Sequence, residues 1–206
     1  DSHYHRVLVY DRQGNILRTY GGDEGTAPLV GRFGYIADVE SDSKGNLYIA
    51  ESQNAERITK ISPEGEILAE CGSLGAQPSQ FQRIRSMLFD STDRLYVADA
   101  CNHRIQVFDA DGKFLSQFGQ PGSAEGEMMY PYDIALAKDG SLFVCEYGNS
   151  RIQRFKTTGQ PLGIWGRPGR EVGELWNPWA IGIDPAGRLY VVDSNNHRIQ
   201  RIRWPE

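Results

Sequence analysis

The chain has 206 residues, of which 39% are apolar and 24% charged, with a formal net charge of −5. A chain of this length can bury one core, and no apolar run approaches the ~20 residues that cross a bilayer as a helix, so no transmembrane segment is expected. Nucleic-acid-binding proteins usually carry a basic footprint, so the acidic balance argues against RNA or DNA as a partner.

One phrase recurs along the chain: an acidic residue, a short loop, an arginine and a β-branched residue. It is clearest from Asp99 to Ile105, from Glu146 to Ile152 and from Asp193 to Ile199. The arginines of the phrase are spaced by 51, 47, 47 and 47 residues, at positions 6, 57, 104, 151 and 198. Two series of glycines keep the same spacing. A fixed period of this size indicates a repeat architecture.

In chain order, the repeats divide the sequence into a partial unit at 1–22, three complete units and a second partial unit at 177–206. The complete units span about 33–74, 83–121 and 130–168. Each contains four strand-like pieces, and Ile134–Leu136, Leu95–Ala98, Ile105–Phe108 and Phe114–Phe118 are examples of the first to the fourth. The second piece is apolar on both faces, which indicates a strand that is covered on both sides.

Four short antiparallel strands in every 40–50 residues are typical of a β-propeller blade. The sequence therefore predicts an all-β fold of four-stranded antiparallel blades. Two strands at the start, twelve in the middle and three at the end correspond to about four and a half blades of a larger propeller. Because open strand edges pair with other chains, we expect the chain to belong to a longer polypeptide or to pair with a neighbour.

Three further phrases identify the family that the chain resembles. Asp193–Gln200 reads Asp-Ser-Asn-Asn-His-Arg-Ile-Gln, and it is accompanied by Asn177–Asp184 and Gly187–Val191. These are similar to NHL repeats, over nearly the whole chain. The resemblance implies one domain, 1–206, that is a six-bladed propeller or a fragment of one. It also favours a bacterial, periplasmic or extracellular protein, but NHL relatives differ too much in function for the fold to decide between them.

The repeated acid–arginine pair is interpreted as structural, because the loop places the two charges opposite each other across a hairpin. His103 and His197 belong to the same phrase and are interpreted likewise. His3 and His5 are the only, weak, candidates for a divalent metal site. A metal-dependent amidating lyase of the NHL family draws ligand histidines from its propeller, whereas the inner strands here offer none; this argues against lyase activity and leaves a divalent metal as the one cofactor to consider.

Functional variation is expected where the repeats disagree. The start of the first strand carries Ala37, Arg85, Tyr132 and Trp179, and the next position carries Asp38, Ser86, Asp133 and Ala180. The preceding loops add Arg83, Tyr130 and Trp176. Aromatic residues and arginine dominate many protein contacts, and the two aspartates could accept a basic group. The alternative interpretation is that these aromatics pack between neighbouring blades.

The leading hypothesis from the sequence is a non-catalytic binding scaffold. One rim of the propeller would contact a protein or peptide partner, and an apolar or positively charged feature of that partner would dock on the rim. The alternative is a metal-dependent propeller enzyme, a lyase or a hydrolase, with its site at the central channel. RNA binding is the third hypothesis.

Overall fold

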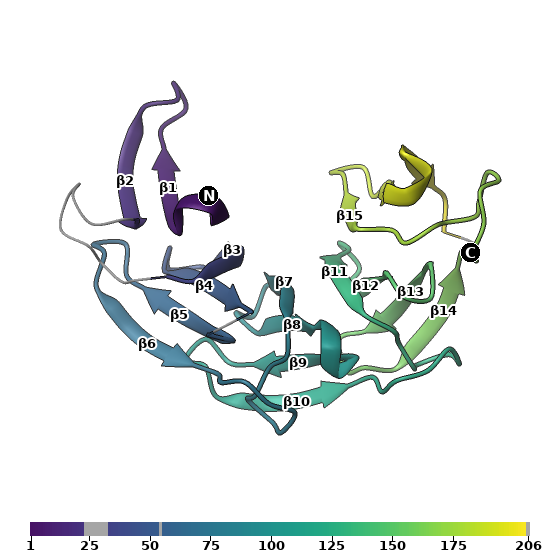
Figure 1. The fold of residues 1–206 in the computed structure, drawn as a ribbon, viewed down its shortest axis with the longest axis horizontal. Helices are drawn as coiled ribbons and strands as arrows, with labels where there is room; N and C mark the ends of the chain where they lie inside the picture. Colours follow the sequence, from purple (N-terminus) through teal and green to yellow (C-terminus); the bar gives the residue numbers. More distant parts are fainter. Residues whose placement is uncertain (23–32, 54, 205–206) are drawn as a thin grey trace.

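The computed structural model describes residues 1–22, 33–53 and 55–204, so most of the predicted insertion between 22 and 33 lies outside the described residues. Within these described residues, seventeen strands form five antiparallel sheets of two, four, four, four and three strands. The sheets follow one another around an arc, with β1 and β2 at one end and β15 at the other (Figure 1). Each sheet is one blade, and the predicted fold class, a β-propeller of four-stranded blades, is confirmed.

The strand bounds follow the repeat. The N-terminal sheet contains β1 (Arg6–Tyr10) and β2 (Ile16–Gly21). The second contains β3 (Tyr35–Ser41), β4 (Leu47–Ser52), β5 (Arg57–Ile61) and β6 (Ile67–Cys71). The third contains β7 (Ile84–Phe89), β8 (Leu95–Asp99), β9 (Arg104–Phe108) and β10 (Phe114–Phe118). The fourth contains β11 (Pro131–Leu136), β12 (Ser141–Glu146), β13 (Arg151–Lys156) and β14 (Pro161–Trp165). The C-terminal sheet contains β15 (Ala180–Ile183), β16 (Leu189–Asp193) and β17 (Arg198–Ile202).

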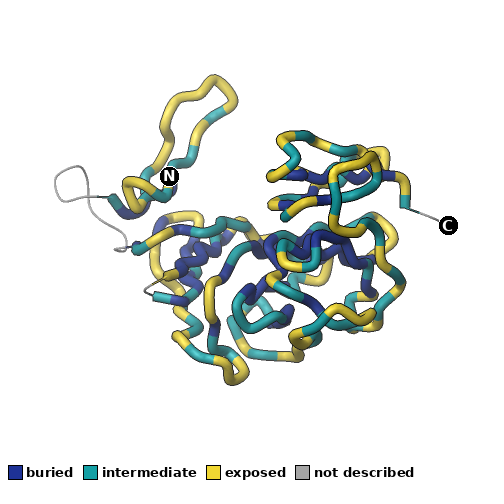
Figure 2. The backbone as a smooth tube through the Cα atoms, turned by 45° about the vertical axis from the view of Figure 1, so that its right-hand side comes forward, coloured by how far each residue is buried: buried dark blue, intermediate teal, exposed yellow. Residues whose placement is uncertain are grey.

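Packing between blades explains why the second strand of each repeat is apolar on both faces. All residues of β8 and β9 are buried, whereas the middle of the outer strand β10 is exposed. One core cluster joins Tyr96 and Ile105 of the third blade to Ile134 and Val144 of the fourth. Figure 2 shows this pattern as buried backbone through the middle of the arc and an exposed hairpin at its N-terminal end. Burial of apolar surface between blades, at about 25 cal/mol per Å², is the main favourable contribution to such a fold.

Three short 3-10 turns were not predicted. They are η1 (Ser2–Tyr4), η2 (Ala100–Asn102) and η3 (Ser194–Asn196), and each ends at a histidine with left-handed backbone, His5, His103 or His197. Each of these histidines directly precedes the arginine that begins the next strand, so the left-handed residue marks the end of the loop. Within the described residues, no helix is long and apolar enough to cross a membrane.

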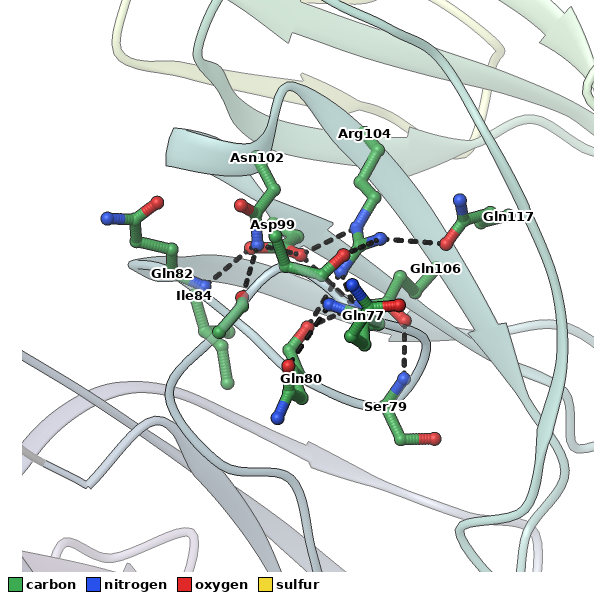
Figure 3. Close-up of polar contacts among 12 residues, drawn as sticks. Gln77, Ser79, Gln80, Gln82, Ile84, Asp99, Asn102, Arg104, Gln106 and Gln117 are labelled. Carbon is green, nitrogen blue, oxygen red and sulfur yellow. Dashed lines mark hydrogen bonds and ion pairs between the residues drawn. The ribbon is translucent and has the colours of Figure 1, made fainter.

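The acid–arginine phrase fixes the long loops that enter the third, fourth and C-terminal sheets, as Figure 3 shows for the third. Arg104 Nε donates to Asp99 at 2.9 Å, and its Nη atoms donate to the carbonyl oxygens of Ala76, Gln77 and Gln80 at 2.8–2.9 Å. Arg151 and Arg198 repeat the arrangement with Glu146 and Asp193. Asp99 is fully buried and Arg104 is 5% exposed. The structural interpretation of the phrase is therefore confirmed.

Candidate functional site at the first strands

Three residues of one repeat position come together at the start of the first, innermost strands. Arg85 lies on β7, Tyr132 on β11 and Trp179 immediately before β15. The Arg85 guanidinium carbon lies 4.6 Å from the centre of the Tyr132 ring and 4.9 Å from that of Trp179. The two rings meet edge to face, with their centres 5.3 Å apart. Such cation–π contacts contribute about 0.5–2 kcal/mol each.

Tyr147 completes this group, although the sequence analysis did not select it. Its ring stacks on Tyr132 with centres 4.5 Å apart and an interplanar angle of 22°, and it meets Trp179 at 6.1 Å. The sequence held a signal for it: the residues that follow the acid of the five phrases are Ser2, Ser52, Ala100, Tyr147 and Ser194, and only one of them is aromatic. We call Arg85, Tyr132, Tyr147 and Trp179 the arginine–aromatic cluster.

The members of the cluster differ in accessibility. Trp179 is 46% exposed, whereas Tyr132 is only 8% exposed. Arg83, which is exposed, places its guanidinium 5.8 Å from the Tyr132 ring centre. Among the described residues, the Arg85 side chain donates no hydrogen bond, and its Nε is buried without a partner. Tyr132 thus lies beneath the guanidinium, and the accessible part of the site consists of Trp179 and the two arginines.

The two aspartates beside the cluster already have partners within the fold. Asp38 accepts the backbone N–H of Met87 at 2.6 Å, and Asp133 accepts that of Ile181 at 2.8 Å. Ser86 Oγ donates to Asp133 at 2.7 Å. Burial raises the pKa of both carboxyl groups. These aspartates join neighbouring blades, which replaces the expectation that they accept a basic group from a partner.

Trp176 and Tyr130 lie apart from the cluster. The Arg170 guanidinium carbon is 4.3 Å from the centre of the Trp176 ring, and the Tyr130 ring meets that of His103 at 4.6 Å. Within the described ranges, no ring contact or hydrogen bond connects either side chain to Arg85, Tyr132 or Trp179. Both are more than a third exposed, at 38% and 37%, so they offer surface next to the site without belonging to the cluster.

The predicted metal candidates have ordinary local contacts. His5 Nδ1 lies 2.7 Å from the carbonyl oxygen of Gly34, to which it can only donate, and the His3 ring meets Tyr4 edge to face. His5 also occupies the repeat position of His103 and His197. In the part of the chain that the structure describes, no group of three or more His, Cys, Asp or Glu side chains is arranged to hold a metal ion.

Comparison with known proteins places the sequence among repeat propellers. Residues 78–164 match the family described as a 6-bladed beta-propeller, and residues 175–202 match the NHL repeat. Human NHL repeat-containing protein 3 is 33% identical over 109 residues, which cover 51% of this chain and 31% of that protein. The mouse protein of the same name is 32% identical over the same length. The aligned stretch thus spans about a third of the curated relatives that it matches.

Solved structures support the fold across the whole chain. A structure of streptogramin B lyase superposes with a TM-score of 0.70 at 19% identity, covering 100% of this chain and 64% of the lyase. A Bacteroides caccae protein of unknown function superposes with a TM-score of 0.63 at 15% identity, covering 98% of this chain and 70% of that one. At these identities the likeness shows a shared fold and carries no activity across.

Proposed function

Because the chain belongs to the NHL-repeat β-propellers, we propose that it is a non-catalytic binding scaffold that holds a protein or peptide through the arginine–aromatic cluster. The observation that carries the proposal is that the Arg85 guanidinium is held in place without a hydrogen-bond acceptor among the described residues. Its guanidinium is held between the faces of Tyr132 and Trp179, yet it donates no hydrogen bond within the described residues. A positioned cation with unused donors beside a half-exposed tryptophan has the composition of an interface hot spot.

The chemistry of the cluster defines the partner feature. Arg85 already occupies one face of the Tyr132 ring and one face of the Trp179 ring and would repel a second cation there, and the carboxylates of Asp38 and Asp133 accept backbone amides. A carboxylate from a partner would supply the acceptor that Arg85 lacks, as a charge-assisted hydrogen bond. An apolar side chain next to that carboxylate would pack on Trp179. We therefore expect an acidic residue beside an apolar one, rather than a basic feature.

Two other expectations remain predictions. A periplasmic or extracellular location is favoured only by the family, and a divalent metal in the central channel, with lyase or hydrolase chemistry, remains the alternative function. Elemental analysis of the purified protein tests the latter directly: a stoichiometric metal that is retained through gel filtration would favour an enzyme over a scaffold.

The binding proposal is tested by selecting peptides from a displayed random library on the wild-type protein and measuring the best peptide by calorimetry. Trp179→Ala and Arg85→Gln should each weaken binding at least tenfold, since loss of a hot-spot residue costs about 2 kcal/mol or more. The matched control is Leu115→Ala on the outer strand β10, because Leu115 is 46% exposed, as Trp179 is. It should leave affinity unchanged.

The outcomes that contradict the proposal are equally definite. Selected peptides that bind both cluster variants as tightly as the wild type would place the site elsewhere. A selection that yields no peptide of at least micromolar affinity would also count against a peptide-binding rim. Circular dichroism of each variant confirms that folding is intact, because neither substitution removes a buried core residue.

A further inference from the structure

At three successive junctions, the side chain at one repeat position accepts a backbone N–H from the blade or sheet that follows. The donor stands 27 residues after the acceptor in each pair, at 2.8, 3.1 and 3.0 Å: Arg83 N with Glu56 Oε2, Tyr130 N with His103 Nδ1, and Asn177 N with Ser150 Oγ. Both residues of every pair have positive φ. The junctions therefore share one local geometry and differ in the acceptor, which is a carboxylate, an imidazole or a hydroxyl.

The imidazole is the acceptor that a proton converts into a donor close to neutral pH. A backbone N–H can only donate, so the contact between Tyr130 N and His103 Nδ1 requires an Nδ1 without a proton. In the imidazolium form both ring nitrogens carry protons, and two donors would then face each other. Protonation of His103 therefore breaks this contact, whereas a hydroxyl such as that of Ser150 has no charge to gain and remains an acceptor.

His5 occupies the same repeat position, and its contact has the opposite polarity. His5 Nδ1 lies 2.7 Å from the carbonyl oxygen of Gly34. A carbonyl oxygen can only accept, so the His5 ring donates, and protonation leaves that bond in place. The acid sensitivity of His103 thus comes from the direction of its hydrogen bond and not from the residue type alone.

The surroundings of the His103 ring keep it neutral at pH 7. The ring is partly buried between two four-stranded blades, and the Tyr130 phenol ring meets it edge to face from the fourth blade, with centres 4.6 Å apart. Burial lowers the pKa of His103 below its ordinary value of 6.5, and the charge of Asp99 opposes this shift. Asp99 is itself paired with Arg104 at 2.9 Å. The contact is therefore closed at neutral pH and opens as the pH falls through the lowered pKa.

Tyr130 connects this contact to the arginine–aromatic cluster in two ways. Its carbonyl oxygen accepts the backbone N–H of Tyr147 at 3.0 Å. Along the chain, one residue separates it from Tyr132, whose ring lies beneath Arg85. That residue is Pro131, whose ring fixes φ and so passes a backbone shift on to the next residue. Two of the four cluster members thus depend on where the Tyr130 peptide group lies.

We propose that His103 is an acid-sensitive latch for the arginine–aromatic cluster: its protonation releases Tyr130, loosens Tyr132 and Tyr147, and lowers the affinity for the partner. The effect on binding rests on the proposed function, whereas the latch itself does not. The scaffold holds its partner at neutral pH and releases it under mildly acidic conditions.

Amide chemical shifts measured by NMR between about pH 7.5 and pH 5 test the latch without a ligand. The Tyr130 amide should titrate with the same midpoint as the His103 ring, below pH 6.5, and the Tyr147 amide should follow. The Asn177 amide, which donates to the Ser150 hydroxyl, should stay constant. His103→Ser copies the acceptor that the repeat already uses at Ser150 and should abolish the titration of both tyrosine amides.

Calorimetry with a selected peptide that lacks histidine tests the coupling to binding. Wild-type affinity should fall about two- to tenfold between about pH 7.5 and pH 5.5, the range expected for one lost hydrogen bond. His103→Ser should match the wild type at the higher pH and keep that affinity at the lower one. His5→Ser is the matched control, because it removes a histidine from the same repeat position whose bond survives protonation. It should show the wild-type fall.

The two proposals fail in different ways. The latch is overturned if the Tyr130 amide does not titrate with His103, or if the Tyr147 amide stays constant while Tyr130 titrates. Peptide affinity that is independent of pH, or that falls equally in His103→Ser, would overturn the coupling to binding. If both tyrosine amides titrate but no peptide can be selected, the latch stands and the proposed function fails.

Discussion

Removal of the buried guanidinium in the Arg104 network should destabilise the protein by about 3 kcal/mol. Arg104 donates five hydrogen bonds, to Asp99, Gln117 and three loop carbonyl groups. Breaking a buried ion pair by deleting one partner costs about 3–5 kcal/mol, because the other charge is left buried. The lower end applies here, since Asn102, Gln106 and the Gln82 amide still donate to the Asp99 carboxylate.

The chain provides its own matched control. Arg6 occupies the same repeat position and pairs with Asp1 at 2.9 Å, but the side chains of Arg6 and Asp1 are 38% and 29% exposed, against 6% for Arg104. Exposed pairs contribute about 0–1 kcal/mol. Urea denaturation followed by tryptophan fluorescence should therefore show a large fall in midpoint for Arg104→Ala and a small one for Arg6→Ala.

The pH dependence of the Arg104→Ala variant gives a second readout. Burial already raises the pKa of Asp99, and loss of the guanidinium should raise it further. A carboxyl group whose folded pKa is raised stabilises the fold at low pH and loses that contribution as pH rises through the folded pKa. The deficit of the variant should thus shrink between pH 7 and pH 4. Equal destabilisation by Arg104→Ala and Arg6→Ala, or a deficit independent of pH, would refute this account.

Two further substitutions test the loops. Gly72→Ala should lower the free energy of unfolding more than Gly14→Ala in the same urea assay. Both glycines have positive φ, but a Cβ at Gly72 would lie 2.6 Å from the Phe81 ring, whereas Gly14 faces open space. Equal decreases in the free energy of unfolding would contradict the steric argument. Burial lowers the pKa of His103, and its Nδ1 accepts the Tyr130 N–H at 3.1 Å only when the ring is neutral. Protonation of His103 should therefore lower the free energy of unfolding as the pH falls below 6.5. In His103→Asn this decrease should be smaller, and asparagine tolerates the left-handed backbone at this position. Parallel pH profiles of wild type and variant would exclude that contribution.

The repeat period made the fold predictable, because each blade buries the same positions for the same reason. Knowing that Arg85, Tyr132 and Trp179 share one repeat position was enough to predict that they form an arc in consecutive blades, since equivalent positions are related by rotation about the axis, but not that they touch. The period could not show that Tyr132 lies beneath Arg85, because burial at that position depends on the ring of Tyr147 from a different loop. It also could not show that Asp38 and Asp133 turn toward backbone amides of the next blade.

The carboxylates of Asp38 and Asp133 have a consequence for how the arc comes apart. In repeat proteins, stability is approximately a sum of unit and nearest-neighbour interface terms. The backbone amides of Met87 and Ile181 donate across blade junctions to these carboxylates. The same repeat position is Ser86 in the third blade and Ala180 in the C-terminal sheet, and neither side chain has a carboxylate. The junctions are therefore unequal, and the molecule should open at defined seams rather than fray evenly. Slow hydrogen exchange at Met87 and Ile181 would show that the two junctions bridged by these amides stay closed while others open, without any change to the sequence.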